Sequence, residues 1–106
     1  MIKAKKKSAV KNLAQAVTRL TACKEEINEK FKVKNICIFG SLARGESKRG
    51  SDIDILVEYR DLPNFFEYAR LERYLEGILR KKVDLVEKTS IREEIKKHIG
   101  GEVVCI

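Results

Sequence analysis

A chain of 106 residues, of which 43% are hydrophobic and 37% charged, has the composition of one folded domain and is too short to hold two cores. Its formal net charge is +7, and no apolar run approaches the roughly 20 residues that a membrane-spanning helix needs. The composition excludes a disordered chain, and we expect a cytoplasmic protein with no membrane span and no secretory signal.

The excess positive charge lies at the N-terminus. No acidic residue precedes Asn12, whereas five lysines do, and the rest of the chain is nearly balanced in charge. Such a tail can contact nucleic acid, but a solvated terminus is the more common case. We therefore expect residues 1–7 to form a solvated basic tail and treat nucleic-acid contact as the lesser alternative.

The first predicted element is one long helix over residues 8–31. Its apolar residues recur every three or four positions, and Ser8 stands where a helix cap is expected. The next apolar run, residues 33–39, is rich in β-branched side chains and predicts a strand that ends at Gly40. A short helical turn over residues 41–46 and a polar loop follow.

The second half of the chain predicts three more strands and two helices. Alternation of Ile53, Ile55 and Val57 with other residues predicts a strand, and Pro63 opens a helix that runs to Arg80. The remaining elements are a strand over residues 83–86, a short helix marked by Ile91, Ile95 and Ile99, and a last short strand over residues 103–106. This order predicts an α/β (α+β) fold, with helices packed on a small mixed sheet.

Two residue types with reactive side chains are scarce. The three cysteines, Cys23, Cys37 and Cys105, are odd in number and far apart, which favours reduced thiols over a disulfide framework or a zinc site. His98 is the only histidine and lies in a basic stretch, so we expect it at the surface and not in catalysis.

Three aspartates carry the strongest chemical signal. Asp52 and Asp54 are two residues apart on a predicted strand, so their side chains share one face, and a cation can bridge them if their carboxylates converge. Taken alone, such a pair is more often an ordinary solvent-exposed face with two surface acids. Asp84 interrupts an otherwise apolar strand, and the crossover helix allows this strand to lie beside the second. Three carboxylates at one sheet surface suit magnesium.

A second candidate feature is the turn at Gly40-Ser41, directly after a strand. Glycine lets the backbone approach an anion closely, the Ser41 hydroxyl adds a hydrogen bond, and Arg44 can neutralise a phosphate oxygen. The alternative is an ordinary helix cap by Ser41. Together with the aspartates, this turn fits two-metal phosphoryl or nucleotidyl transfer, in which Asp84 binds the metal nearer the acceptor and accepts the acceptor's proton.

These residues identify a family resemblance. The spacing from Gly40-Ser41 to Asp52-Ile53-Asp54, within the run IFGSLARGESKRGSDIDILVE, resembles the signature of the polymerase-β-like nucleotidyltransferase superfamily. That run, and KKVDLVEK around Asp84, are similar to the minimal nucleotidyltransferase (MNT, or MntA-like) branch. The resemblance covers about residues 33–106, which predicts a single domain over residues 1–106 with its catalytic core in that segment.

The resemblance implies a nucleotidyltransferase fold, ATP as nucleotide donor and magnesium, with two ions expected. It also implies a partner, because MNT proteins are commonly antitoxins that transfer AMP to a tyrosine of a helical HEPN-type ribonuclease toxin. Nucleotidyltransferases that act on antibiotics or RNA usually carry a second helical domain, which we do not find in this sequence. Candidate partner surfaces are the N-terminal helix and the Phe65-Phe66-Tyr68 edge, although core packing is the favoured interpretation of those aromatic residues.

Three alternatives remain open. The chain could transfer a nucleotide to a small molecule or an RNA end, or act as a non-catalytic antitoxin that only binds its toxin. It could also be a small nucleic-acid-binding protein that uses its lysine tail. The nearly balanced charge of the body disfavours this last alternative.

Overall fold

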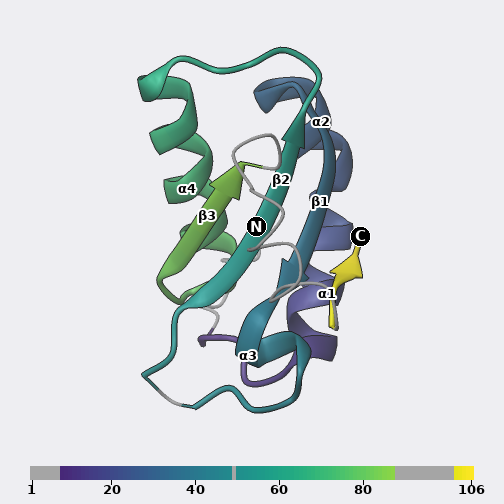
Figure 1. The fold of residues 1–106 in the computed structure, drawn as a ribbon, viewed down its shortest axis with the longest axis vertical. Helices are drawn as coiled ribbons and strands as arrows, with labels where there is room; N and C mark the ends of the chain where they lie inside the picture. Colours follow the sequence, from purple (N-terminus) through teal and green to yellow (C-terminus); the bar gives the residue numbers. More distant parts are fainter. Residues whose placement is uncertain (1–7, 49, 88–101) are drawn as a thin grey trace, which may run out of the picture.

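A four-stranded mixed sheet with helices on one face forms the body of the protein. The computed structural model describes residues 8–48, 50–87 and 102–106. The strands are β1 (Val33–Phe39), β2 (Ile53–Tyr59), β3 (Val83–Glu87) and β4 (Val104–Cys105), in the spatial order β3-β2-β1-β4 (Figure 1). This arrangement confirms the predicted fold class.

The N-terminal helical region differs from the prediction of one helix over residues 8–31. It consists of α1 (Leu13–Ala22) and α2 (Lys24–Phe31), which meet at Cys23. The cap of α1 is Asn12, whose side chain accepts a hydrogen bond from Gln15 N–H, and not Ser8. Val10 is buried before the helix begins, and its N–H donates to the carbonyl of Leu79.

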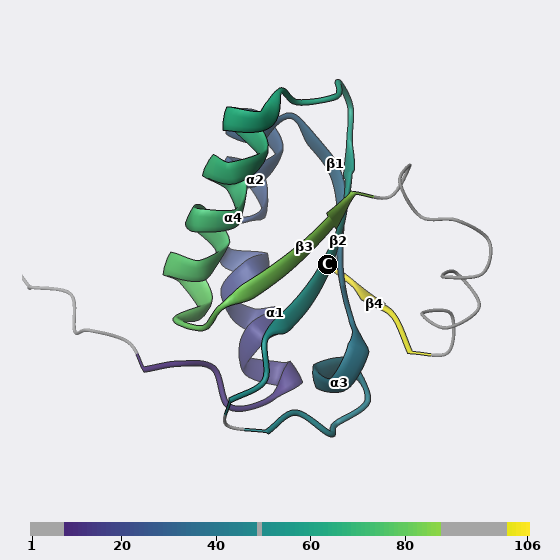
Figure 2. The ribbon, with the colours of Figure 1, turned by 60° about the vertical axis from the view of Figure 1, so that its left-hand side comes forward.

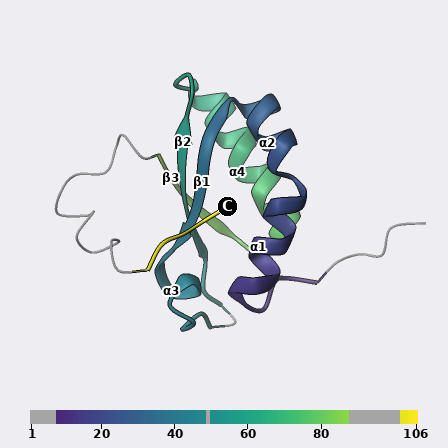
Figure 3. The same cartoon turned by 90° about the vertical axis from the view of Figure 1, so that its right-hand side faces the viewer.

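The helices α1, α2 and α4 (Phe65–Leu79) cover one face of the sheet, and the other face carries no helix from the described residues (Figures 2 and 3). The helix α4 begins at Asn64, whose side chain forms a capping box with Glu67. Its buried residues pack on the apolar face of β2, where Ile53, Ile55 and Val57 are fully buried. In the described ranges, no helix is both long and apolar enough to cross a membrane.

The register of the sheet brings the two site-bearing strands together. The crossover through α4 makes β3 parallel to β2, as predicted, and pairs Asp54 with Asp84. On its other side β2 pairs antiparallel with β1, which places Phe39 opposite Asp54. The expected site therefore lies at the end of the sheet where β1 ends and β2 and β3 begin.

The expectation of three reduced thiols is wrong. Cys37 and Cys105 form a disulfide, and only Cys23 is free. The cause is the pairing of β4 with β1, which sets these two cysteines directly opposite each other with their Cα atoms 3.9 Å apart. Two cysteines separated by 68 residues gave no sign of this pairing in the sequence.

The expectation of core packing for Phe65 and Phe66 is also wrong. These side chains are 79% and 76% exposed, because they lie on the first turn of α4, beyond the part of the helix that packs on the sheet. Tyr68, one turn later, is half-buried and donates a hydrogen bond to the carbonyl of Leu85. The expected helix at Ile91, Ile95 and Ile99 and the expected surface position of His98 lie outside the described residues.

Candidate active site

The three predicted aspartates meet on the face of the sheet opposite the helices. Asp54 and Asp84 are register partners on adjacent strands, and Asp52 directly precedes β2. Asp54 is half-buried, whereas Asp52 and Asp84 are exposed. The cost of burying Asp84, which the apolar pattern of its strand suggested, is therefore avoided because this face of β3 is open.

Asp54 is the centre of the acidic cluster. Burial raises the pKa of its carboxyl group above the ordinary value, and the nearby charges of Asp84 and Asp52 raise it further. Arg44 has the opposite and smaller effect on the pKa of Asp54. The ionised cluster is therefore under mutual repulsion, which a bound cation would relieve.

Gly40 packs directly against this cluster. It has a φ of +74°, a left-handed conformation that favours glycine, and it begins the single-turn helix α3 (Gly40–Ala43) at the end of β1. A Cβ atom at this position would overlap Oδ2 of Asp54 and would lie 2.9 Å from its Cγ. Both the backbone conformation and the close approach to Asp54 therefore require glycine.

Ser41 and Arg44 lie close to the same end of the sheet. The cap residue of α3 is Phe39, with no side-chain hydrogen bond, so Ser41 does not serve as the helix cap considered as its alternative role. Within the described residues, the Ser41 hydroxyl has no hydrogen-bond partner. Arg44 is exposed and its Nε lies 2.9 Å from Oε1 of Glu46, a pairing that the sequence did not indicate.

The donor set fits magnesium. Among the described residues, no group of three or more acidic, histidine or cysteine side chains is arranged so that it could hold a metal ion. Magnesium does not need such a group, because it keeps several waters and takes few ligands from protein carboxylates. Burial and the neighbouring carboxylates, which together raise the pKa of Asp54, are the observation that favours a cation here, and Asp52, Asp54 and Asp84 are the residues that would hold it.

The comparison with known proteins agrees with this geometry. Residues 20–104 match the family model of the nucleotidyltransferase domain. The chain belongs to this family. A protein adenylyltransferase MntA from Thermococcus cleftensis is 43% identical over 98 residues, which cover 92% of this chain and 99% of the relative.

A second relative and a solved structure are also similar to this chain. A provisionally named protein adenylyltransferase from Methanocaldococcus jannaschii is 50% identical over 82 residues, covering 77% of this chain and 95% of its own length. A solved toxin–antitoxin structure with AMP-PNP is 26% identical, covers 87% of this chain and 69% of its own, and has a TM-score of 0.64. These similarities confirm the predicted minimal nucleotidyltransferase branch, and this chain is a nucleotidyltransferase.

Proposed function

We propose that this chain is a magnesium-dependent protein adenylyltransferase that acts as the cytoplasmic antitoxin of a toxin–antitoxin pair. In this proposal it transfers AMP from ATP to a tyrosine of a helical HEPN-type toxin. The single observation that supports transfer chemistry most strongly is the contact of Gly40 with Asp54, beside Asp84. The relatives named as protein adenylyltransferases and the toxin–antitoxin structure with AMP-PNP support the acceptor and donor classes.

The reaction balances with the groups at this end of the sheet. The tyrosine oxygen forms a bond to the α-phosphorus of ATP, the bond from that phosphorus to the bridging oxygen of the β-phosphate breaks, and pyrophosphate leaves. The phenolic proton passes to Asp84, which is exposed beside Asp54. The backbone at Gly40, the Ser41 hydroxyl and Arg44 orient the triphosphate. Bound magnesium supplies positive charge that screens the carboxylates from the phosphates.

A label-transfer experiment tests this proposal. The full chain, its co-purified partner, magnesium and ATP labelled at the α- or the γ-phosphate are incubated together. We expect the α-label, and not the γ-label, on the partner. Asp54→Asn should lower the rate by at least about 100-fold because it removes a carboxylate that would hold the cation. Asp61→Asn is the matched control, because this exposed acid lies in the loop before α4 and should leave the rate unchanged.

The result also separates the alternatives. An α-label that appears on RNA or a small molecule instead of on the partner would point to a different acceptor. If neither label moves while the partner stays bound and is neutralised, the chain is an antitoxin that acts by binding alone. Either outcome would overturn protein adenylylation.

A further inference from the structure

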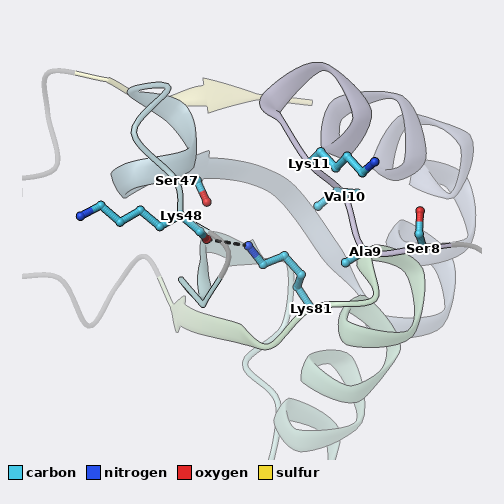
Figure 4. A pocket seen from close by; sticks show the side chains of 7 residues that line it. All are labelled: Ser8, Ala9, Val10, Lys11, Ser47, Lys48 and Lys81. Atoms are coloured by element: carbon cyan, nitrogen blue, oxygen red, sulfur yellow. Dashed lines mark hydrogen bonds between the residues drawn. The ribbon is translucent and has the colours of Figure 1, made fainter.

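A second charged surface lies beside the loop that leads into Asp52. It surrounds a cavity of about 410 Å³, and its lining residues include three lysines and no acid: Ser8, Ala9, Val10, Lys11, Ser47, Lys48 and Lys81 (Figure 4). A neighbouring hollow shares Lys81 and is lined by Glu76, Arg80 and Lys82 as well. We call the five cations of these two cavities the basic end: Lys11, Lys48, Arg80, Lys81 and Lys82.

The charges of the basic end are not neutralised within the described part of the chain. The ion pairs found there involve Lys30 and Arg44, and neither belongs to this surface. The one carboxylate that lines either cavity, Glu76, accepts a hydrogen bond from the N–H of Val83. The surface therefore has an unbalanced positive charge, which favours an anionic ligand.

Backbone contacts hold the three segments of this surface together. The N–H of Val10 donates to the carbonyl of Leu79, which fixes the segment that carries Lys11 against the end of α4. The Lys81 ammonium donates to the carbonyl of Lys48 over 3.3 Å, and the N–H of Ser51 donates to the same carbonyl. The cations are thus carried by connected parts of the fold.

The arrangement of the lysines indicates the class of ligand. In Figure 4 Lys81 crosses the cavity, whereas the Lys11 and Lys48 side chains extend from opposite rims. Charges spread in this way suit an anion with spaced phosphates better than a single phosphate group. Neither cavity is lined by an aromatic side chain on which a base could stack, so the contact would be to the phosphate backbone and independent of sequence.

The sequence carries further positive charge directly before this surface. Ser8, which lines the cavity, directly follows a segment with lysines at positions 3, 5, 6 and 7. We propose that the basic end binds the phosphate backbone of a nucleic acid. This binding is separate from the nucleotidyl-transfer reaction. The structure supports it because it groups the cations of the basic end around two cavities, which the sequence alone did not indicate.

Fluorescence anisotropy tests this proposal with no ATP or magnesium present. The probes are a labelled single-stranded RNA and a labelled DNA duplex, and each is titrated with the full chain. The titrations are repeated at KCl concentrations from about 50 to about 300 mM, a range in which phosphate contacts weaken. We expect a dissociation constant on the order of 1–100 μM near physiological salt. The triple variant Lys11→Gln, Lys48→Gln, Lys81→Gln should weaken binding at least about tenfold and reduce the salt slope by roughly 2–3.

A matched triple variant controls for net charge. Lys24→Gln, Lys30→Gln, Lys34→Gln removes the same charge from α2 and the start of β1, and should change affinity by less than about twofold. Removal of residues 1–7 should weaken binding further in either background. Thermal melts verify that each variant is folded.

Four outcomes would overturn the proposal. These are no binding by the native chain at low salt, equal losses in the two triple variants, loss on truncation alone with no effect of the first triple variant, or equal affinity for polyglutamate. The last would assign the surface to an acidic protein. A preference between the two probes would tell RNA from DNA within the proposed class.

Discussion

Gly40 is the residue where backbone conformation and chemistry depend most closely on each other. Its positive φ and the absence of a side chain allow α3 to begin against the Asp54 carboxylate. Gly45 has a nearly identical φ of +73°, but a Cβ there would meet nothing within 4 Å. A side chain at Gly45 would therefore cost only the free energy of a left-handed backbone conformation. A side chain at Gly40 would cost this free energy and also displace Asp54.

This difference predicts the effect of two alanine substitutions. Gly45→Ala should cost about 1–2 kcal/mol in unfolding free energy and leave label transfer nearly unchanged. Gly40→Ala should cost more and should lower transfer by at least about 100-fold, because Asp54 must move to admit the methyl group. Denaturant melts and label-transfer rates of both variants provide the measurements. Equal effects of the two substitutions on transfer would contradict this account.

The raised pKa of Asp54 makes a second prediction at the residue scale. Since burial and two neighbouring carboxylates raise it, the ionised form is less favourable in the folded than in the unfolded chain. The stability contributed by the protonated form is complete below the unfolded pKa and is lost as pH rises through the folded pKa. In chelator, Asp54→Asn should therefore be more stable than the native chain at about pH 7, and the gap should close toward about pH 4.

Thermal melts across this pH range measure the gap, and added magnesium provides the control. A cation that binds the folded native chain should raise its melting temperature and not that of the variant. A gap that does not change with pH would show that the aspartate charge is not its cause.

Among the strands of the described sheet, β4 is the shortest and pairs with β1 alone. It pairs two of its residues with β1, and the N–H of Ile106 donates to the carbonyl of Ile36. The disulfide from Cys37 adds a covalent link to this short strand at the edge of the sheet. By contrast, α4 is held by three fully buried leucines: Leu71, Leu75 and Leu79. The attachment of β4 therefore depends on redox conditions, whereas that of α4 does not.

Removal of the disulfide gives the corresponding prediction. Cys105→Ser should lower the unfolding free energy by about 2–4 kcal/mol, since a cross-link over 68 residues restricts the unfolded chain strongly. Cys23→Ser, which removes the free thiol, serves as the control and should show no comparable loss. Denaturant melts with and without a dithiol reductant measure the effect. A native chain that is equally stable in both conditions would contradict the prediction.

Across the whole molecule, the sequence predicted what local patterns determine. Alternation in β2, the crossover helix and the position of Asp84 were enough to predict that two strands lie side by side with their carboxylates level. The break at Cys23 and the exposure of Phe65 were not predictable in this way. Apolar spacing shows which face of a helix is buried, but not where the helix leaves the sheet.

The charge distribution of the folded molecule was also not predictable from the sequence. A nearly balanced body suggested no basic surface, because a net charge contains no information about position. The fold gathers Lys11, Lys48 and Lys81 from three distant segments of the chain. The disulfide likewise depends on the pairing of β4 with β1, which the path of the whole chain determines.

The two faces of β2 differ: buried isoleucines point toward the helices, and Asp54 points toward the candidate active site. A shift of one residue along this strand would exchange the faces, placing the carboxylate among apolar side chains and an isoleucine beside Gly40. Deleting one residue within β2 would therefore damage folding and catalysis at once.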